Sequence, residues 1–195
     1  MATTYAELKT EISAFTHRSD LTAYLDTFID FAEARLNRDL RVSQQETILT
    51  ASATQYITLP ADFLAVRVLN KQSNPVQELR YITPAEMDRI ADGSTTLNYY
   101  TILGDSIKLQ AASSTDIELT YYAKIPALDG TNTSNWVLAT HPDVYLYACL
   151  FEAYNWTQNE AQASKYAVLF ANGINMIRQA DAQRKYGNSL IVRAA

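Results

Sequence analysis

Hydrophobic residues recur at helical spacing near the start of the chain. Thr4-Tyr-Ala-Glu7 is a capping box, in which Thr4 and Glu7 can satisfy each other's free backbone N–H groups, so it predicts a first helix that ends near His17. Ser19 is a suitable N-cap for a second helix. The apolar stripe expected on this second helix is Leu21, Leu25, Phe28, Ala32 and Leu36. The two segments together predict a helical hairpin.

Two longer helices are predicted towards the other end of the sequence. His141-Pro142-Asp143 places a proline in the first turn and an acid where it meets the positive end of the helix dipole. The residues that follow are apolar on nearly all sides, which is typical of a buried helix. The last helix begins at Asn159, and its apolar stripe is Ala163, Tyr166, Phe170, Ile177 and Ala180. Gly173 lies within it, and either close helix packing or a bend would explain a glycine there.

The middle of the chain has the alternation and the turns of β structure. Strands are expected over residues 47–50, 56–59, 63–69 and 76–82. A second capping box, between Thr83 and Glu86, predicts one short helix that ends at Asp92-Gly93. Gly104-Asp105 is a two-residue hairpin turn between segments 99–103 and 106–110. A half-buried strand is expected where Ile117, Leu119 and Tyr121 alternate with polar residues and Tyr122.

These patterns predict an α+β fold. Its core is a helical bundle, made of the N-terminal helical hairpin and the two long C-terminal helices, and an antiparallel β-rich region with one short helix is inserted into it. The expected domains are residues 1–41 and 136–187 for the helical core, 42–135 for the insertion and 188–195 for an extended tail. The tail is aliphatic but too short to fold on itself, so we expect a neighbouring chain to cover it.

Composition limits the classes of function. The chain has 195 residues and a net charge of −5, which argues against ordinary nucleic-acid binding because that requires clustered Lys and Arg. Cys149 is the one cysteine, so no internal disulfide forms, and its apolar neighbours favour a buried, inert thiol. The start of the chain lacks the features of a signal peptide, and no stretch approaches the roughly 20 apolar residues of a membrane span. We therefore expect a soluble protein that is made inside the cell and does not bind a membrane.

No pattern predicts an active site. His17 and His141 stand apart, no cysteine cluster exists, and neither a phosphate-binding loop nor a dinucleotide fingerprint is present. Asp26, Asp30 and Glu33 share a helix face and could bind a cation or act as an acid–base pair, but a solvated polar face is the favoured interpretation. We expect no enzymatic activity, no metal and no cofactor.

The 13 tyrosines point to contact surfaces. Tyrosine offers a large contact area with few rotatable bonds, and it also stacks on single-stranded bases. No Lys or Arg cluster accompanies the pairs Tyr99-Tyr100 and Tyr121-Tyr122, so sheet or subunit contacts are favoured over base stacking. In each pair one ring is expected to face the core and the other to face outward. With Trp136, these four residues are the candidate interface aromatics.

Several segments carry a resemblance through their joint order along nearly the whole chain. They are Phe28-Ile-Asp-Phe-Ala-Glu-Ala-Arg-Leu-Asn-Arg38, Leu59-Pro-Ala-Asp-Phe-Leu64, Tyr81-Ile-Thr-Pro-Ala-Glu86, Tyr100-Thr-Ile-Leu-Gly-Asp-Ser-Ile107, Ile117-Glu-Leu-Thr-Tyr-Tyr-Ala-Lys124, and Asn135-Trp136 before Asp143-Val-Tyr-Leu-Tyr147. In this order they resemble the tailed-bacteriophage adaptor proteins, which complete the head and connect it to the tail.

The resemblance implies a structural role in the virion. Such proteins assemble in the bacterial host cytoplasm and form a ring, commonly a dodecamer, in the neck between capsid and tail. The implied partners are the portal protein, further copies of the chain, tail, nozzle or stopper proteins, and genomic DNA that passes without sequence-specific binding. The C-terminal segment of related adaptors docks onto the portal, so Leu190, Ile191, Val192 and Arg193 are the expected portal-binding residues.

Three other interpretations stay open at the level of sequence. Trp136 and the tyrosine pairs could form the platform of a carbohydrate-binding tail component. Paired acids could serve a small hydrolase, although no motif supports it. A single-strand-binding module should show affinity that falls steeply with salt.

Overall fold

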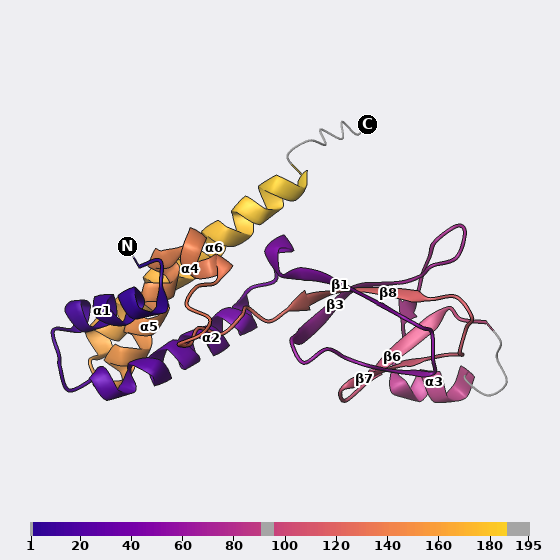
Figure 1. The fold of residues 1–195 in the computed structure, drawn as a ribbon, viewed down its shortest axis with the longest axis horizontal. Coiled ribbons are helices and arrows are strands. Elements are labelled where there is room, and N and C mark those ends of the chain that lie inside the picture. Colours follow the sequence, from indigo (N-terminus) through magenta and orange to yellow (C-terminus); the bar gives the residue numbers. More distant parts are fainter. Residues whose placement is uncertain (1, 91–95, 187–195) are drawn as a thin grey trace. The chain divides into compact units, whose positions relative to one another are not determined.

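The structure is a computed structural model that describes residues 2–90 and 96–186. It is mixed α+β, with six α-helices and two sheets, which confirms the predicted fold class (Figure 1). The chain divides into two compact units, here called the helical unit, from residues 1–44 and 125–195, and the β unit, residues 45–124. The predicted tail, 188–195, lies outside the described residues.

The first helix, α1 (Tyr5–Thr16), begins at the predicted capping box. The Thr4 hydroxyl oxygen accepts a hydrogen bond from the Glu7 N–H at 3.3 Å, and the Glu7 carboxylate accepts one from the Thr4 N–H at 3.3 Å. Because both groups lie within one turn of each other in the sequence, local chemistry is enough to fix this helix start.

The second helix begins later than predicted. Helix α2 spans Leu25–Asp39, and a 3₁₀ turn, η1 (Thr22–Tyr24), precedes it. Ser19 was expected to cap α2, and this is wrong: its carbonyl oxygen accepts a hydrogen bond from the Thr22 hydroxyl at 2.8 Å and closes the loop. Tyr24 occupies the N-cap position of α2 and forms no side-chain capping bond, so this helix start lacks the local chemistry that a serine cap would supply.

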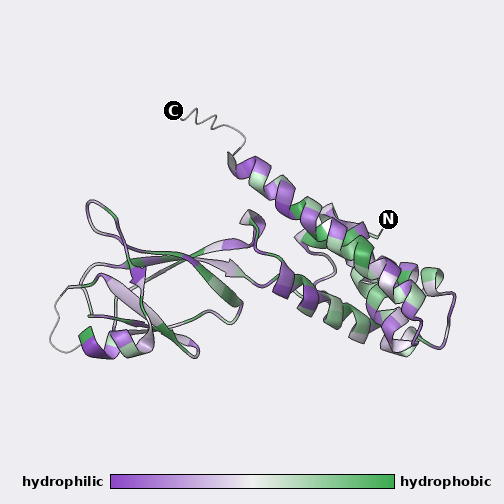
Figure 2. Ribbon diagram, turned by 180° about the vertical axis from the view of Figure 1, so that it is seen from behind, coloured by the Kyte–Doolittle hydropathy of each residue, from purple (hydrophilic) through white to green (hydrophobic). Residues whose placement is uncertain are grey.

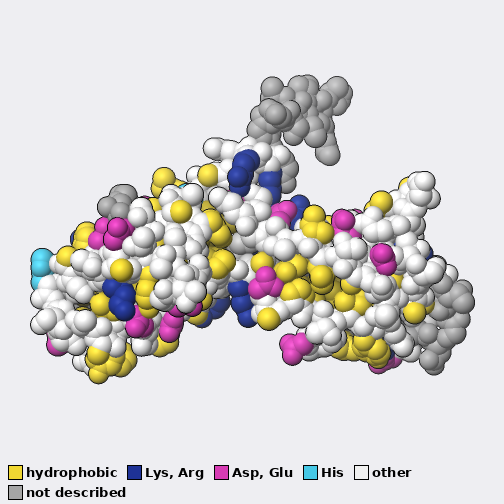
Figure 3. Space-filling view, in the orientation of Figure 1, with side chains coloured by type: hydrophobic (Ala, Val, Ile, Leu, Met, Phe, Trp, Pro, Cys, Tyr) yellow, Lys and Arg dark blue, Asp and Glu magenta, His cyan; other side chains and the backbone are white. Residues whose placement is uncertain are grey.

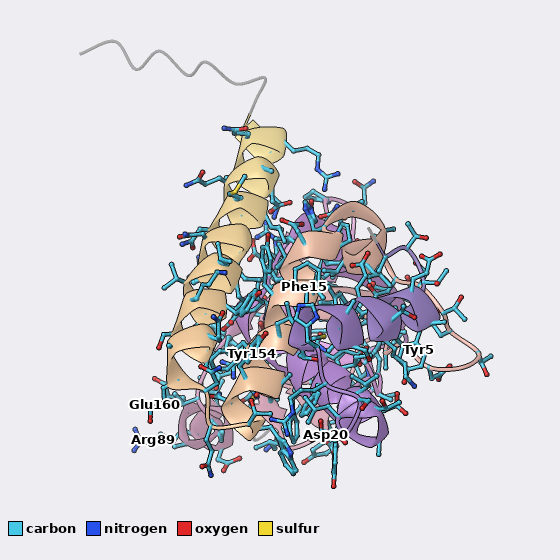
Figure 4. All side chains as sticks on the ribbon, turned by 90° about the vertical axis from the view of Figure 1, so that its left-hand side faces the viewer. Tyr5, Phe15, Asp20, Arg89, Tyr154 and Glu160 are labelled. Carbon is cyan, nitrogen blue, oxygen red and sulfur yellow. The ribbon has the colours of Figure 1, made fainter. Side chains whose placement is uncertain are left out.

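Helix α5 (Pro142–Trp156) is the centre of the helical unit. It packs against α1 and α2 and also against α6 (Glu160–Tyr186), and the short helix α4 (Trp136–Thr140) precedes it. Figure 4 shows α6 on one side of α5, with α1 and α2 on the other. The predicted burial of α5 on most sides is confirmed, because the buried residues are Val144, Tyr145, Leu146, Ala148, Cys149, Leu150 and Ala153.

Gly173 lets α6 approach α5 closely. A Cβ atom placed on this residue would lie 2.5 Å from the Cγ2 atom of Val144, closer than carbon atoms pack. The close-packing interpretation of this glycine is therefore confirmed. The apolar face predicted for the last helix is buried at Ala163, Tyr166, Phe170 and Ile177, and Ile174 joins it, whereas Ala180 is exposed.

The β unit contains two four-stranded sheets. Their orders are β1-β8-β3-β4 and β2-β7-β6-β5. All pairs are antiparallel except β5 with β6, which is parallel. The strands are β1 (Glu46–Ala51), β2 (Tyr56–Thr58), β3 (Phe63–Lys71), β4 (Gln77–Glu78), β5 (Arg80–Tyr81), β6 (Tyr99–Leu103), β7 (Ser106–Leu109) and β8 (Ile117–Ala123).

Local signals in the β unit predict its turns and its short helix correctly. Gly104 has φ +55°, a left-handed conformation that glycine adopts easily, and it begins the turn between β6 and β7. Helix α3 (Pro84–Ile90) starts at the capping box, where the Thr83 hydroxyl donates to the Glu86 carboxylate at 2.8 Å. Its predicted end at Asp92-Gly93 lies outside the described residues.

The strand expected over 76–82 is wrong as a single element. It divides into β4, which pairs with β3 in one sheet, and β5, which pairs with β6 in the other. Leu79 lies between them, is 2 % exposed, and donates its N–H to the Leu69 carbonyl oxygen at 2.8 Å. Burial of this one side chain in the core of the β unit makes the backbone change sheets.

The loop after β8 belongs to the helical unit. Ile125 and Leu128 are buried in the core of the helical unit, so the compact β unit ends at residue 124, before the boundary expected at 136.

Figure 2 shows hydrophilic colours in the last turns of α6, beyond its buried apolar face.

Candidate functional site

The part of the chain that the structure describes offers no candidate metal site. Within residues 2–90 and 96–186, no three His, Cys, Asp or Glu side chains are placed to hold a metal ion. Cys149 is fully buried, as expected, and its burial raises the pKa of the thiol well above its ordinary value. A protonated, inaccessible thiol is a weak nucleophile, so packing explains this residue.

The predicted acidic helix face divides into two environments. Asp26 is exposed and paired, with its carboxylate 2.6 Å from Lys9 Nζ and 2.6 Å from the Tyr5 hydroxyl, and these hydrogen bonds lower its pKa. Glu33 is only 6 % exposed, so a solvated face is the wrong interpretation for it. Its side chain lies under the loop that follows β8, which the one-dimensional pattern of α2 could not show.

Glu33 holds the chain that leaves the β unit. Its Oε1 atom accepts hydrogen bonds from the Leu128 N–H and from the Tyr145 hydroxyl, both at 2.7 Å. Burial raises the pKa of Glu33, and these two hydrogen bonds offset the effect only in part. One turn further along α2, the side-chain oxygen of Asn37 accepts from the Ile125 N–H at 2.8 Å. The polar face of α2 therefore satisfies backbone groups that would otherwise be buried unpaired.

The C-terminal half of α6 is tied to the connection that follows α2. The Asp181 carboxylate accepts hydrogen bonds from the Ser43 N–H at 3.0 Å and from its hydroxyl, and it pairs with Lys185 at 3.0 Å. Burial tends to raise the pKa of Asp181, but the hydrogen bonds from Ser43 and the nearby Lys185 hold it below its ordinary value. Arg178 donates to the Asp39 carbonyl oxygen. The sequence patterns did not predict this anchor. Its one signal in the sequence is that Asp181 follows the buried Ile177 by four residues and so lies on the same face of the helix.

A groove of about 320 Å³ lies between α2 and α6 within the helical unit. Its apolar lining includes Phe151 and Phe170. The Arg35 guanidinium lies 4.4 Å from the Phe151 ring centroid and donates to the Glu152 carboxylate at 2.6 Å. The lining also includes Asp39 and Arg178, so the groove combines apolar rings with charged groups, as protein contact surfaces do.

Exposed aromatic rings mark one end of the helical unit. Tyr24 and Trp156 are 43 % and 54 % exposed, and their ring centroids lie 5.1 Å apart. Phe31 of α2 is 48 % exposed and follows Tyr24, the last residue of η1, by seven residues. We call these three residues the aromatic patch. Figure 3 shows hydrophobic side chains gathered over the beginning of α2. Exposed aromatic rings on one surface are typical of protein–protein contacts.

A second apolar surface lies on the outer side of α6. Val168 and Met176 are 60 % and 70 % exposed and are eight residues apart, so they lie on one face of the helix. No charged residue occurs between Lys165 and Arg178. We call Val168 and Met176, with the exposed Ala171, Asn172 and Asn175, the α6 stripe. A long uncharged stretch on a solvent-facing helix favours burial against another chain.

The structure places the candidate interface aromatics in different environments. Tyr100 and Tyr121 are core residues of the β unit, 7 % and 4 % exposed, while Tyr99 and Tyr122 are half-buried. One ring of each pair lies in the core, as expected, and the other ring is half-buried and not fully exposed. Trp136 is half-buried against the helical core. The five rings therefore do not form one exposed platform within either unit.

The expected portal-binding residues Leu190, Ile191, Val192 and Arg193 lie outside the described residues. Among the helices that the structure describes, none combines the length and the apolar character needed to cross a membrane. The surfaces that remain as candidates are the aromatic patch, the α6 stripe and the groove, all of them suited to other proteins.

Comparison with known proteins identifies one family. The model of the family described as SU10 adaptor protein matches residues 3–193 of the chain. No curated protein is similar enough in sequence to count as a relative. The match covers both units, and it agrees with a chain whose accessible features are contact surfaces.

Proposed function

Since the chain belongs to the SU10 adaptor protein family, a family of bacteriophage head–tail adaptors, we propose that it forms a ring in the virion neck that binds below the portal protein. Membership makes it a structural component of the virion at the head–tail junction, in contact with other head or tail proteins. The proposed ring extends the DNA channel, provides the platform on which tail proteins attach, and has no catalytic role. The match over residues 3–193 is the observation that carries this proposal.

The helical unit has the two different surfaces that a ring requires. A closed ring of identical chains uses a heterologous interface, in which one patch on each copy meets a different patch on the next. Tyr24 and Phe31 of the aromatic patch come from the α2 side of α5, and the α6 stripe lies on α6, on the other side (Figure 4). In the proposed ring, the aromatic patch of one copy covers the α6 stripe of its neighbour, and a dodecamer is the expected number of copies.

The ring can be tested at the α6 stripe. Replacing both Val168 and Met176 by glutamate places two charges in the proposed interface, and the desolvation of such charges should abolish incorporation into necks. The control is Gln183→Glu, an exposed position on the same helix beyond the stripe. Electron microscopy of necks purified from phage lacking the wild-type gene, with each variant supplied in the host, measures incorporation. Normal necks with the double variant would contradict the proposed interface.

Portal attachment is assigned to residues Leu190, Ile191, Val192 and Arg193. The support is twofold: these residues are apolar or basic, and they follow a helix that is anchored in its C-terminal half through Asp181 to Ser43. Deleting residues 188–195 should leave the free protein folded, with an unchanged unfolding transition, while the chain no longer joins heads that contain portal. Unchanged attachment of the shortened chain would assign portal binding to another surface.

The acidic balance of the chain supports a channel role. A net charge of −5 repels phosphate groups, so DNA can slide past the ring without being held.

The β unit is assigned to contacts with a neighbouring copy or with tail, nozzle or stopper proteins. Cryo-electron microscopy of intact necks would locate the chain between portal and tail, and its absence from that position would refute the proposed function.

A further inference from the structure

One sheet edge of the β unit is built differently from the others. Exposed strand edges offer unpaired N–H and C=O groups, and proteins usually protect them by keeping the strand short, by bulges, or by charged residues. In the sheet order β1-β8-β3-β4, strand β1 forms one edge, and it is six residues long. In the other sheet the edges are β2 and β5, with three and two residues.

Strand β1 lacks the usual protection of an edge. It pairs with β8 without a register shift, from Glu46 opposite Tyr122 to Ala51 opposite Ile117. After Glu46 the strand continues Thr-Ile-Leu-Thr-Ala, without charge, proline or glycine. Ile48 is 62 % exposed. Within the described part of the chain, the backbone of residues 47–51 forms no hydrogen bond other than those of its ladder with β8.

The opposite edge of the same sheet is protected. Strand β4 covers only Asn70 and Lys71 of β3. The rest of β3 carries register shifts at residues 63–65 and 66–68, and it includes Arg67. Bulges and a charge disturb the straight row of donors and acceptors that strand addition needs. Of the described edges, β1 alone is long, regular and uncharged over five successive residues.

We propose that β1 accepts an extended segment of a different head–tail junction protein as an added strand of its sheet. Main-chain hydrogen bonds to residues 47–51 hold the segment, and an apolar side chain on it covers Ile48. That the donor is a virion protein rests on the proposed function, while the capacity for strand addition rests on the edge itself. The partner segment is β-forming and poor in charge where it faces Ile48, since a charge there would be desolvated without a partner.

A second copy of this chain is a poorer match for the edge. The described strands of a neighbouring copy offer only short or bulged edges, so none presents a complementary run of five residues. Pairing of β1 with β1 of another copy would be isologous and would require a two-fold axis between the two chains. Neighbours in a closed cyclic ring are related by the ring rotation, so such a pair does not form between them.

Cross-linking from Ile48 tests the identity of the partner. The natural Cys149 is fully buried, so an Ile48→Cys variant carries one accessible thiol in the described part of the chain. The matched control is Val76→Cys, an aliphatic residue of the same unit that is 58 % exposed. A benzophenone maleimide is attached to each free protein, the labelled chains are assembled onto heads that lack the adaptor, and the irradiated necks are analysed by mass spectrometry.

The expected product joins position 48 to one short segment of a different virion protein, and the control does not give it. A cross-link from position 48 to a second copy only, or no cross-link in complete necks, overturns the proposal. If the labelled chain is missing from necks that are otherwise complete, the proposed function fails as well. The two failures are thus distinguished by whether this chain is present in the neck.

A pair of proline variants tests whether the backbone makes the contact. In an antiparallel ladder, successive N–H groups point alternately to the paired strand and to the open side. Thr47 and Thr50 are both exposed and stand an odd number of residues apart, so one of Thr47→Pro and Thr50→Pro removes an inward donor and the other an outward donor. Thermal unfolding identifies the outward variant as the more stable of the two.

The outward proline variant should lose the partner although its β unit stays folded. The readout is the yield of the cross-link from Ile48→Cys combined with that proline, and we expect at least a tenfold reduction relative to Ile48→Cys alone. An unchanged yield would show that side chains alone hold the partner, and it would overturn strand addition.

Discussion

Replacing Gly173 by alanine inserts a Cβ atom 2.5 Å from Cγ2 of Val144, where α6 crosses α5. Val144 is 2 % exposed and lies in the first turn of α5, so it cannot rotate into solvent. The two helices must separate or one side chain must leave its preferred rotamer. The variant therefore combines a favourable change in helix propensity with an unfavourable change in packing.

The two effects are of comparable size and opposite sign. Alanine stabilises a helix interior by about 1 kcal/mol relative to glycine. Overpacking a well-packed core by a methyl group costs about 1–3 kcal/mol. With a packing cost of about 2 kcal/mol, Gly173→Ala lowers the free energy of unfolding by about 1 kcal/mol.

A double-mutant cycle separates propensity from packing. Val144→Ala alone removes two buried methyl groups and leaves a small cavity, at a cost of about 2 kcal/mol. In that background the new Cβ of residue 173 enters vacated space, so Gly173→Ala should stabilise by about 1 kcal/mol. The coupling energy between the two positions is then about 2 kcal/mol, within the range for contacting residues.

Urea unfolding followed by tryptophan fluorescence measures these changes in the helical unit. Both tryptophans of the chain, Trp136 and Trp156, belong to that unit, so the signal does not report on the β unit. The control is Asn172→Ala, an exposed neighbour on the same helix, which should stabilise by a few tenths of a kcal/mol through propensity alone. If Gly173→Ala stabilises the otherwise wild-type chain by as much as propensity predicts, the close approach of α6 to Val144 is refuted.

Two further predictions concern the buried carboxylates. Glu33→Ala leaves the Leu128 N–H and the Tyr145 hydroxyl without an acceptor and should lower the free energy of unfolding by about 3 kcal/mol. Glu33→Gln retains an oxygen for both donors and should change the free energy of unfolding by less than about 1 kcal/mol. Equal losses for the two variants in urea unfolding would contradict this prediction. The pKa of Glu33 in the native state lies above its ordinary value of 4.5, so protonation of Glu33 favours the folded chain. The wild-type chain should therefore gain stability relative to Glu33→Gln as the pH falls from neutral towards 4.5. Asp181→Asn should lower the free energy of unfolding by about 1–2 kcal/mol at neutral pH. Since the native pKa of Asp181 lies below 3.8, the difference in stability between this variant and the wild type should disappear only as the pH falls below 3.8. Loss of that difference at a higher pH would refute the pairing with Ser43.

Several elements follow from chemistry that is local in the sequence. The capping boxes at Thr4 and Thr83 join groups three residues apart, and both define helix starts as predicted. The turn at Gly104 requires a left-handed backbone that glycine adopts easily. Alternation along β8 predicts its buried face, because successive side chains of a strand point to opposite sides. Such signals decide where elements begin and which face is apolar, and so they determined the α+β class from sequence alone.

The buried polar contacts were decided by the tertiary structure. Glu33 and Tyr145 are 112 residues apart in sequence, and Asp181 and Ser43 are 138 residues apart, so no local pattern shows that they meet. The division of the segment around Leu79 between two sheets has the same origin, because burial of one side chain outweighs β propensity over seven residues.

The candidate surfaces divide in the same way. Sequence composition indicated contact surfaces, and the order of segments along the chain indicated the adaptor family. Only the packing of α5 between its neighbours left the aromatic patch and the α6 stripe exposed, and only the sheet order made β1 an edge. Hydrophobicity in a sequence states which residues avoid water, but which of them the chain itself can cover depends on contacts between segments far apart in sequence.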